Sequence, residues 1–430
     1  MGDSVEPRNA RGGTLILGGG FGGSWIARLL GKSGATIVNP DNFSLFTPLL
    51  PEAASGTVEP RHVVVPLRQM CPHADLLLGS VEALDSSGRV ATVNTEAGQV
   101  DVSYERVVVA LGAVSRTLPI PGLAEHGVGF KTLADAIYLR NHVLRRLEAA
   151  DAATSRVEAQ RQLTFVFVGA GYAGVEALAE SRDLVLDAIR HYPNLKTMPQ
   201  RWVLVDAAPA ILAEIPRRLG AYAARHLEKQ GIEIHCSTRL ESVERDGVTL
   251  STEERIGTET LVWTAGVKPN PLVAELGLPL DERGRIVVDD TLAVDGHPGV
   301  WALGDCAAVA NSATPEELDP PTCQHALRQA RSVARNIERL ADGHEPKSYG
   351  YRMLGQVATL GRHKGIADAL GLKFGGFLGW WIARTYHLYQ LPLFSRKLRL
   401  VADWTTALFF RRDIAELSVL TPRPPKLPPD

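Results

Sequence analysis

The chain has 430 residues, of which 45% are hydrophobic, and its formal net charge is −2. A chain of this length and composition is expected to form about two to three domains with a sizeable buried core. The near-neutral charge gives no electrostatic footprint for nucleic acid, so a nucleic-acid partner is not expected. The four cysteines are too far apart for a zinc knuckle or a disulfide framework and indicate a reducing compartment; they are Cys71, Cys236, Cys306 and Cys323.

The chain shows no targeting or membrane-spanning pattern. Its first eleven residues are polar, and no long uncharged apolar stretch occurs later. We therefore expect the protein to stay in the cytosol without spanning a membrane.

The first predicted motif is a strand, a glycine turn and a helix. Residues 14–17 are apolar, residues 24–34 have a helical period, and the turn between them has GxGxxG spacing at Gly18, Gly20 and Gly23. Such glycines allow a tight turn, close approach of a pyrophosphate and close helix packing. Phe21 and Gly22 are expected in the same cofactor-binding turn, although a plain glycine-rich turn is the alternative. The inward side chains of the helix are expected to be Ile26, Leu29 and Leu30.

The strand after this helix, residues 35–39, ends at Asn39. An acid usually holds the adenosine ribose at this position. Because an amide can still form hydrogen bonds there, we expect weaker but retained nucleotide binding.

The same pattern recurs about 150 residues later, which predicts a second nucleotide site. A strand again leads into three glycines at the same spacing, Gly169, Gly171 and Gly174. The next strand ends at Asp206, whose carboxylate can accept hydrogen bonds from both ribose hydroxyls and would repel a 2′-phosphate. This pattern favours NADH over NADPH, and a solvated carboxylate at a strand end is the alternative.

Three further apolar segments have the character of strands that end near a cofactor. They are residues 107–116, which include Gly112, residues 260–270, which include Gly266, and "PGVWALGDCA", which includes Gly304 and Asp305. Asp305 could accept hydrogen bonds from a ribityl chain. The alternatives are ordinary turns and an aspartate that caps the following turn.

The C-terminal part is basic and amphipathic. Residues 371–412 contain seven basic residues and one acid, which gives +6 and leaves −8 for the rest of the chain. Between residues 377 and 389 the helical period gathers the apolar side chains on one arc, with Arg384, His387 and Gln390 opposite. After Pro392 a second helix is expected, and its apolar face is Leu400, Val401, Trp404 and Leu408. Such helices suit the headgroup layer of a membrane, whereas packing on the core or at a dimer interface is the alternative.

Taken together, these motifs resemble the flavoproteins with two dinucleotide-binding domains, and most closely the type II, non-proton-pumping NADH:quinone oxidoreductases. The most specific stretches are "FSLFTPLLPEAASGTVEPRHVVVPLR" and "LPLFSRKLRLVADWTTALFFRRDIAEL", because soluble disulfide reductases have neither.

The resemblance implies roles for individual residues. It places Phe46, Thr47 and Pro48 near the flavin ring, and Gly112 and Asp305 on the flavin nucleotide. Glu176, two residues after the second glycine turn, is implied beside the nicotinamide; a favourable interaction with the helix dipole is the alternative. A glutamine motif implies Gln324 between flavin and quinone, with Gln329 and His325 as further quinone contacts. Cys323 replaces the usual alanine of that motif, so capping or surface roles stay open.

The resemblance also implies a fold and a domain order. We expect an α/β protein with two Rossmann-like domains and a C-terminal amphipathic membrane-binding segment. The expected regions are an FAD-binding domain at 12–118 and 268–368, an NADH-binding domain at 119–267, a membrane-association region at 369–420 and a disordered tail at 421–430.

The implied activity is hydride transfer from NADH to FAD and then two-electron reduction of a membrane quinone, without proton pumping. The implied partners are a membrane quinone, the cytoplasmic face of the cell membrane and a second copy in a homodimer. Three alternatives stay open: a soluble NADH-dependent reductase of an acceptor such as ferredoxin, a sulfide:quinone oxidoreductase using Cys306 and Cys323, and a flavin-binding redox sensor.

Overall fold

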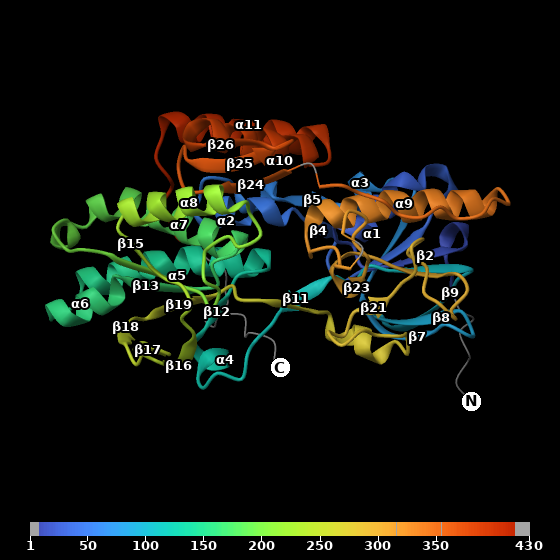
Figure 1. Cartoon of the computed structure of the whole chain (residues 1–430), viewed down its shortest axis with the longest axis horizontal. Coiled ribbons are helices and arrows are strands. Elements are labelled where there is room, and N and C mark those ends of the chain that lie inside the picture. Colours follow the sequence, from blue (N-terminus) through green and yellow to red (C-terminus); the bar gives the residue numbers. More distant parts are fainter. Residues whose placement is uncertain (1–7, 315, 354, 418–430) are drawn as a thin grey trace. The chain divides into compact units, whose positions relative to one another are not determined.

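The computed structural model describes residues 8–417 except 315 and 354. The chain forms two compact units (Figure 1). The described residues of the first lie within 1–45, 64–114 and 267–353, and the second contains 46–63, 115–266 and the described residues after 354. Each unit contains a parallel five-stranded sheet, which confirms the expected α/β class with two Rossmann-like units.

The first unit is built on a parallel five-stranded sheet in the order β22-β10-β2-β3-β6. Its central strands are almost wholly buried because helices cover them, as expected for a parallel sheet. The strands are β22 (Val300–Ala302), β10 (Arg106–Val109), β2 (Thr14–Leu17), β3 (Thr36–Asn39) and β6 (Asp75–Leu78). The helices of this unit are α1 (Phe21–Leu29), α3 (Leu67–Met70) and α9 (Cys323–Ala341).

A second sheet of the first unit has four strands in the order β1-β9-β8-β7. These strands are β1 (Arg8–Asn9), β9 (Gly98–Ser103), β8 (Val90–Thr95) and β7 (Ser80–Asp85). Short pairs complete the unit: β4 (Phe43–Leu45) with β5 (Val64–Pro66), and β21 (Ile286–Val287) with β23 (Ala307–Ala308). The chain passes between the units near β11 (Ala113–Ser115) and β20 (Val267–Pro269).

The second unit repeats the parallel design in the order β12-β19-β13-β14-β15. The strands are β12 (Val128–Gly129), β19 (Thr260–Trp263), β13 (Thr164–Val168), β14 (Arg201–Val205) and β15 (Ile232–His235). An antiparallel sheet of β16 (Leu240–Glu244), β17 (Gly247–Leu250) and β18 (Arg255–Gly257) adds its apolar side chains to the same core. The helices of this part are α2 (Leu50–Ala54), α4 (Leu123–His126), α5 (Leu133–Asp151), α6 (Arg156–Gln162), α7 (Tyr172–Ala188) and α8 (Arg217–Lys229).

The C-terminal part of the second unit combines a small sheet with two helices (Figure 1). The sheet contains β24 (Gly355–Thr359), β25 (Gly365–Ala369) and β26 (Leu372–Gly375), and it packs against α10 (Gly376–Gln390). The second helix is α11 (Phe394–Phe409). Both helices are where the sequence predicts them. The expected tail at 421–430 lies outside the described residues.

Two predictions about packing need correction. Residues 46–63 and 355–368 group with the second unit rather than the first, because α2 packs on α5 and α7 and β24 also packs on α7. Leu29 is 38% exposed although it was expected to point inward. Gly23, Ile26, Ala27 and Leu30 already form the inner face of α1, and Leu29 falls beyond its edge.

Among the described residues, no helix is both long and apolar enough to cross a bilayer.

Candidate active site

The first glycine turn has the backbone geometry of a phosphate cradle. Gly18 has φ +109°, a conformation that L side chains rarely adopt. A Cβ on Gly23 would overlap the backbone oxygen of Gly18, so the helix can approach the strand only with glycine here. Gly20 caps α1 without a side-chain hydrogen bond, and the space around its Cα is open. This helix start, with open space at Gly20, fits the pyrophosphate of a dinucleotide such as FAD.

Asn39 is fixed beside the same turn. Its Oδ1 accepts a hydrogen bond from the Gly19 N–H at 2.7 Å, and its Nδ2 donates to the Asp41 carbonyl at 2.8 Å. An amide therefore fills the acceptor position next to the turn while one Nδ2 hydrogen and one Oδ1 lone pair stay available for a ribose. This geometry agrees with retained nucleotide binding in the absence of an acid.

The backbone at the end of β22 is held by Gln329. Gln329 is 2% exposed, its Oε1 accepts from the Gly304 N–H at 2.7 Å and its Nε2 donates to Asp319 at 2.9 Å. Gly304 itself has φ +73° and begins the short turn that contains Asp305. Both ends of the Gln329 amide thus have protein partners, and its quinone contact stays an expectation. Its side chain positions the Gly304 turn.

His325 is also part of the interior. It is 3% exposed, its Nδ1 lies 2.8 Å from the Thr322 hydroxyl, and its Nε2 lies 3.6 Å from Asp319. Burial lowers the pKa of His325, so the ring favours the neutral form. These contacts give His325 a structural role in the interior, and its contact with a quinone stays an expectation. Gln324, in the first turn of α9, is half-buried and accepts a hydrogen bond from the Tyr351 hydroxyl at 3.2 Å.

The cysteines near these residues are poor nucleophiles. Burial raises the pKa of Cys323 to about 12 and that of Cys306 to about 11. Both therefore stay thiols at neutral pH, and thiols are far weaker nucleophiles than thiolates. This protonation state weighs against the sulfide:quinone alternative.

The second glycine turn repeats the first. Gly169 has φ +106°, and a Cβ on Gly174 would overlap the Gly169 oxygen. Gly171 caps α7 with open space around it. At the end of β14, Asp206 Oδ1 accepts from the Ala208 N–H at 2.7 Å and Oδ2 accepts from the Ala170 N–H. Each oxygen keeps a further lone pair, which fits the two ribose hydroxyls of NADH.

Glu176 is a buried carboxyl group in α7. It is 7% exposed, and its Oε1 accepts from the Thr359 N–H at 2.7 Å and from the Thr359 hydroxyl at 3.1 Å. Burial raises the pKa of Glu176 to about 8, although the Thr359 hydrogen bonds oppose the shift. The group can thus hold or release a proton near neutral pH. The alternative, a carboxylate favoured only by the dipole of α7, stays open, because Glu176 lies near the start of that helix.

The remaining predicted residues are distributed over both units. In the first unit Phe21 and Gly22 begin α1, and Gly112 has φ +66° with open space around it. In the second unit Thr47 begins a short 3-10 turn and Gly266 has φ +82°. Thr47 therefore does not share a unit with the first cradle, and its flavin contact stays an expectation.

Sequence reasoning missed a buried ionic cluster that holds the C-terminal segment. Glu180 accepts from Arg412 at 2.7 Å and from the Ser55 hydroxyl at 2.7 Å. Burial works to raise the pKa of Glu180, but the Arg412 charge and the Ser55 hydrogen bond outweigh it and lower the pKa. Glu52 accepts from Arg384 at 3.1 Å and from the Trp404 indole at 2.6 Å. The cluster fixes α10, α11 and the residues after them on α2 and α7.

The predicted separation of an apolar and a polar face in α10 is confirmed, and the cluster shows that the polar face is the inner one. Arg384 and His387, predicted opposite the apolar arc of α10, are buried. Leu400, predicted on the apolar face of α11, is buried as well, whereas Val401 and Leu408 of that face are exposed. Of the seven basic residues counted in this segment, Arg384 and Arg412 lie in internal ion pairs, which leaves five for the surface. The side chains exposed instead are apolar: Phe377, Leu378, Trp381, Tyr389, Phe394, Leu398, Val401, Leu408, Phe409 and Phe410.

Comparison with known proteins agrees with these features. Residues 13–330 match the family described as pyridine nucleotide-disulphide oxidoreductase. The type II NADH:quinone oxidoreductase NdhA of Mycobacterium tuberculosis is 31% identical over 423 residues, which cover 93% of this chain and 88% of that protein. The type II NADH:quinone oxidoreductase of Staphylococcus aureus is 28% identical and covers 84% of this chain and 90% of its own length.

A solved structure shows the same fold. The structure of NDH2 from Plasmodium falciparum in complex with NADH superposes with a TM-score of 0.86 at 17% identity, and covers 95% of this chain and 100% of that one. The paired glycine turns and the sequence match over 93% of the chain place it in one group: it belongs to the type II NADH:quinone oxidoreductases, within the pyridine nucleotide-disulphide oxidoreductase family.

Proposed function

We propose that this protein is an FAD-dependent NADH:quinone oxidoreductase. The observation that carries the proposal is the pair of glycine turns, one beside Asn39 and one beside Asp206, in a chain that matches type II enzymes over nearly its whole length. In the overall reaction NADH is oxidised to NAD⁺, the quinone is reduced to quinol, and one proton is taken up.

FAD, when bound, supplies the group that takes a hydride from NADH and returns two electrons to the quinone. The first glycine turn holds its pyrophosphate, and Asn39 orients the turn through Gly19. Gln329 keeps the Gly304 turn in place. As the resemblance implies, Gly112, Gly304 and Asp305 contact the flavin nucleotide, and Gln324 lies toward the quinone.

Protein groups of the second unit bind NADH and handle the proton. The second glycine turn holds the pyrophosphate of NADH, and Asp206 accepts from its ribose. Glu176 is buried and protonated at neutral pH, so it can supply a proton and recover it from solvent. Because no conduit across a bilayer is part of this scheme, energy is conserved only as quinol.

The test is a two-step spectroscopic assay on purified protein with bound FAD. NADH should lower the visible flavin absorbance, and a short-chain quinone analogue should restore it. Flavin that keeps its absorbance with NADH would refute the dehydrogenase activity and favour a sensor. If NADH lowers the flavin absorbance, and ferredoxin restores it while the quinone does not, the protein is a soluble reductase.

We further propose that α10 and α11 bind the membrane surface on its cytoplasmic side. Ten apolar side chains of this region are exposed, from Phe377 (58%) to Phe410 (68%), and Arg396, Lys397 and Arg399 lie on the same segment. Exposed aromatic residues beside cations suit the headgroup layer of an anionic bilayer. This surface would bring the enzyme to a lipid-soluble quinone.

Vesicle flotation tests the membrane proposal. The double variant F377S/W381S should lose most binding to vesicles that contain phosphatidylglycerol. The control V157S/L280S removes two exposed apolar side chains elsewhere and should bind like the parent. Equal binding of all three proteins would refute the proposal.

The homodimer implied by the resemblance is also a proposal. Sedimentation of the detergent-solubilised protein tests it, and a species with the mass of one chain of 46.5 kDa would refute it.

A further inference from the structure

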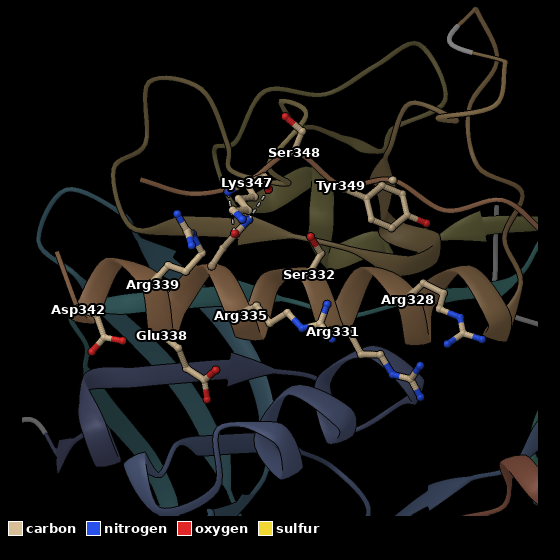
Figure 2. A pocket seen from close by; sticks show the side chains of 12 residues that line it. Arg328, Arg331, Ser332, Arg335, Glu338, Arg339, Asp342, Lys347, Ser348 and Tyr349 are labelled. Atoms are coloured by element: carbon tan, nitrogen blue, oxygen red, sulfur yellow. Dashed lines mark hydrogen bonds between the residues drawn. The ribbon is translucent and has the colours of Figure 1, made fainter. Parts of the chain in front are cut away.

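The first unit contains a polar pocket that none of the proposed chemistry uses. Its volume is about 670 Å³, a size typical of small-molecule sites. One wall is α9, and the other is the segment 347–350 (Figure 2). Among the residues that line it, none has an aliphatic side chain, so the pocket is unsuited to an acyl chain or another apolar ligand.

Positive charge is concentrated along one stripe of α9. Arg328, Arg331, Arg335 and Arg339 follow each other at spacings of three or four residues, which places them on one side of the helix (Figure 2). Lys347 adds a fifth cation from the opposite wall, and Glu338 and Asp342 are the two acids of the lining, so the pocket carries a net charge of +3.

The like-charge pairs of this stripe are unfavourable for the helix, and the opposite-charge spacings Arg335/Glu338 and Arg339/Asp342 offset part of that cost. Like charges three or four residues apart each destabilise a helix by about 0.2–0.5 kcal/mol. Among the described residues, no carboxylate lies within ion-pair distance of Arg328, Arg335 or Arg339. An anionic ligand would supply the missing counter-charge.

The two walls are rigidly connected. Asn336 is 1% exposed; its Nδ2 donates to the Lys347 carbonyl at 2.9 Å and its Oδ1 accepts from the Lys347 N–H at 2.9 Å. On the next turn of α9, Arg339 Nε donates to the Glu345 carbonyl at 2.7 Å, which leaves its terminal nitrogens available. The distance between the walls is therefore set before any ligand binds.

Aromatic rings orient two of the guanidinium groups. Arg328 lies over Tyr351 at 5.2 Å from the ring centroid, and Arg331 lies over Trp25 at 5.7 Å. A guanidinium held in this way loses less freedom when it forms paired hydrogen bonds to a phosphate. The four arginines extend over about 16 Å of helix, which matches a ligand with several charges rather than one.

We propose that this pocket binds a small soluble molecule that carries several phosphate groups, such as a nucleoside triphosphate. The phosphates contact the arginine stripe, and Glu338 and Asp342 accept hydrogen bonds from hydroxyl or amino groups of the same ligand. The same helix holds the Gly304 turn through Gln329 on its buried side, so a bound ligand stabilises the helix that supports the flavin cradle.

Calorimetric titration with sodium tripolyphosphate tests the proposal. The holoenzyme is used with saturating NAD⁺, so that the nucleotide site of the second unit is filled. Saturable binding of one tripolyphosphate per chain is expected. Loss of two charge-assisted contacts in R335A/R339A should weaken it by at least about tenfold, and added salt should weaken it further.

A matched control removes two exposed cations at the same helical spacing from α8. R225A/K229A should bind tripolyphosphate within about twofold of the parent, and both variants should oxidise NADH like the parent, which shows that they fold. Absence of saturable binding, or equal loss in both variants, would overturn the proposal.

A second experiment, vesicle flotation, distinguishes a soluble phosphate from a lipid headgroup as the ligand of the pocket. R335A/R339A should float with phosphatidylglycerol vesicles as the parent does. If it loses vesicle binding while its tripolyphosphate affinity stays unchanged, the stripe contacts lipid and the proposal is wrong.

Discussion

The two glycine turns are alike as far as their third glycine and differ after it. Gly18 and Gly169 have nearly the same φ, and Gly23 and Gly174 approach the strand oxygen in the same way. Two residues further on, α1 has Trp25, which lies under the Arg28 and Arg331 guanidinium groups, whereas α7 has the buried Glu176.

The acceptors at the next strand end differ as well. Asn39 accepts one backbone N–H and donates to another residue, while Asp206 accepts two backbone N–H groups. We therefore propose that the shared glycines build the phosphate cradle, and that the residues around them decide which nucleotide binds and whether a proton can be held. The following variants test this division.

The largest effect is expected for the third glycine of each turn. Gly23→Ala should lower FAD affinity and Gly174→Ala should raise the KM for NADH, each by about 100-fold, because the added methyl group overlaps a backbone oxygen. Bound FAD per chain and NADH kinetics measure the two effects separately. Gly350→Ala, at a site with open space, is the control. If each alanine affected both nucleotides equally, the two cradles would not be independent.

The next effect concerns the pH dependence of stability. Glu176 has a folded pKa of about 8, raised from 4.5, so the native state keeps a proton that the unfolded state releases between these values. The stabilising contribution of protonated Glu176 to the unfolding free energy is therefore fully present below about pH 4.5. It is lost as the pH rises through 8. Glu176→Gln should remove roughly 3–4 kcal/mol of the decrease in unfolding free energy between pH 5 and pH 8.

Chemical denaturation at both pH values measures this difference. Leu186→Gln, an exposed change on the same helix, should leave the parent's pH dependence intact. If the unfolding free energy of the parent and of Glu176→Gln fell by the same amount between pH 5 and pH 8, Glu176 would be ionised in the folded protein at neutral pH.

A smaller effect is expected for nucleotide choice. Asp206→Asn gives the second turn the acceptor of the first and removes the charge that repels a 2′-phosphate. The preference for NADH over NADPH, measured as the ratio of kcat/KM values, should narrow by about tenfold. An unchanged ratio would exclude Asp206 from the ribose site.

The smallest effect is expected at Asn39. Asn39→Ala leaves the Gly19 N–H without its acceptor and should weaken FAD binding by about fivefold. In Asn39→Asp, the carboxylate still accepts a hydrogen bond from the Gly19 N–H, but it faces the Asp41 carbonyl, to which it cannot donate. Because these two effects oppose each other, the affinity of this variant for FAD should stay within about twofold of the parent. FAD fluorescence titration checks both. A large gain in FAD affinity in Asn39→Asp would show that the natural amide limits flavin binding.

The sequence predicts those features that depend on local pattern. The strand at Thr14–Leu17, the positions of both turns and the two C-terminal helices follow from spacing, glycine and periodicity. The contacts of Gln329 do not, because its partners Gly304 and Asp319 come from other segments.

The buried ionic cluster was missed for the same reason. Glu52 and Arg384 are 332 residues apart, and Glu180 and Arg412 are 232 apart. Helical periodicity places Arg384 opposite the aromatic side chains, but only the fold shows that this polar side is the inner one.

The ionic cluster has a consequence for handling the protein in water. Because Arg384, Trp404 and Arg412 hold the last two helices in place, the exposed apolar surface of α10 and α11 is formed by the protein alone, without lipid. Adsorption would then need no coil-to-helix transition, and its heat-capacity change would reflect covered apolar area alone. The same preformed surface should make the purified enzyme self-associate reversibly unless detergent or lipid covers it.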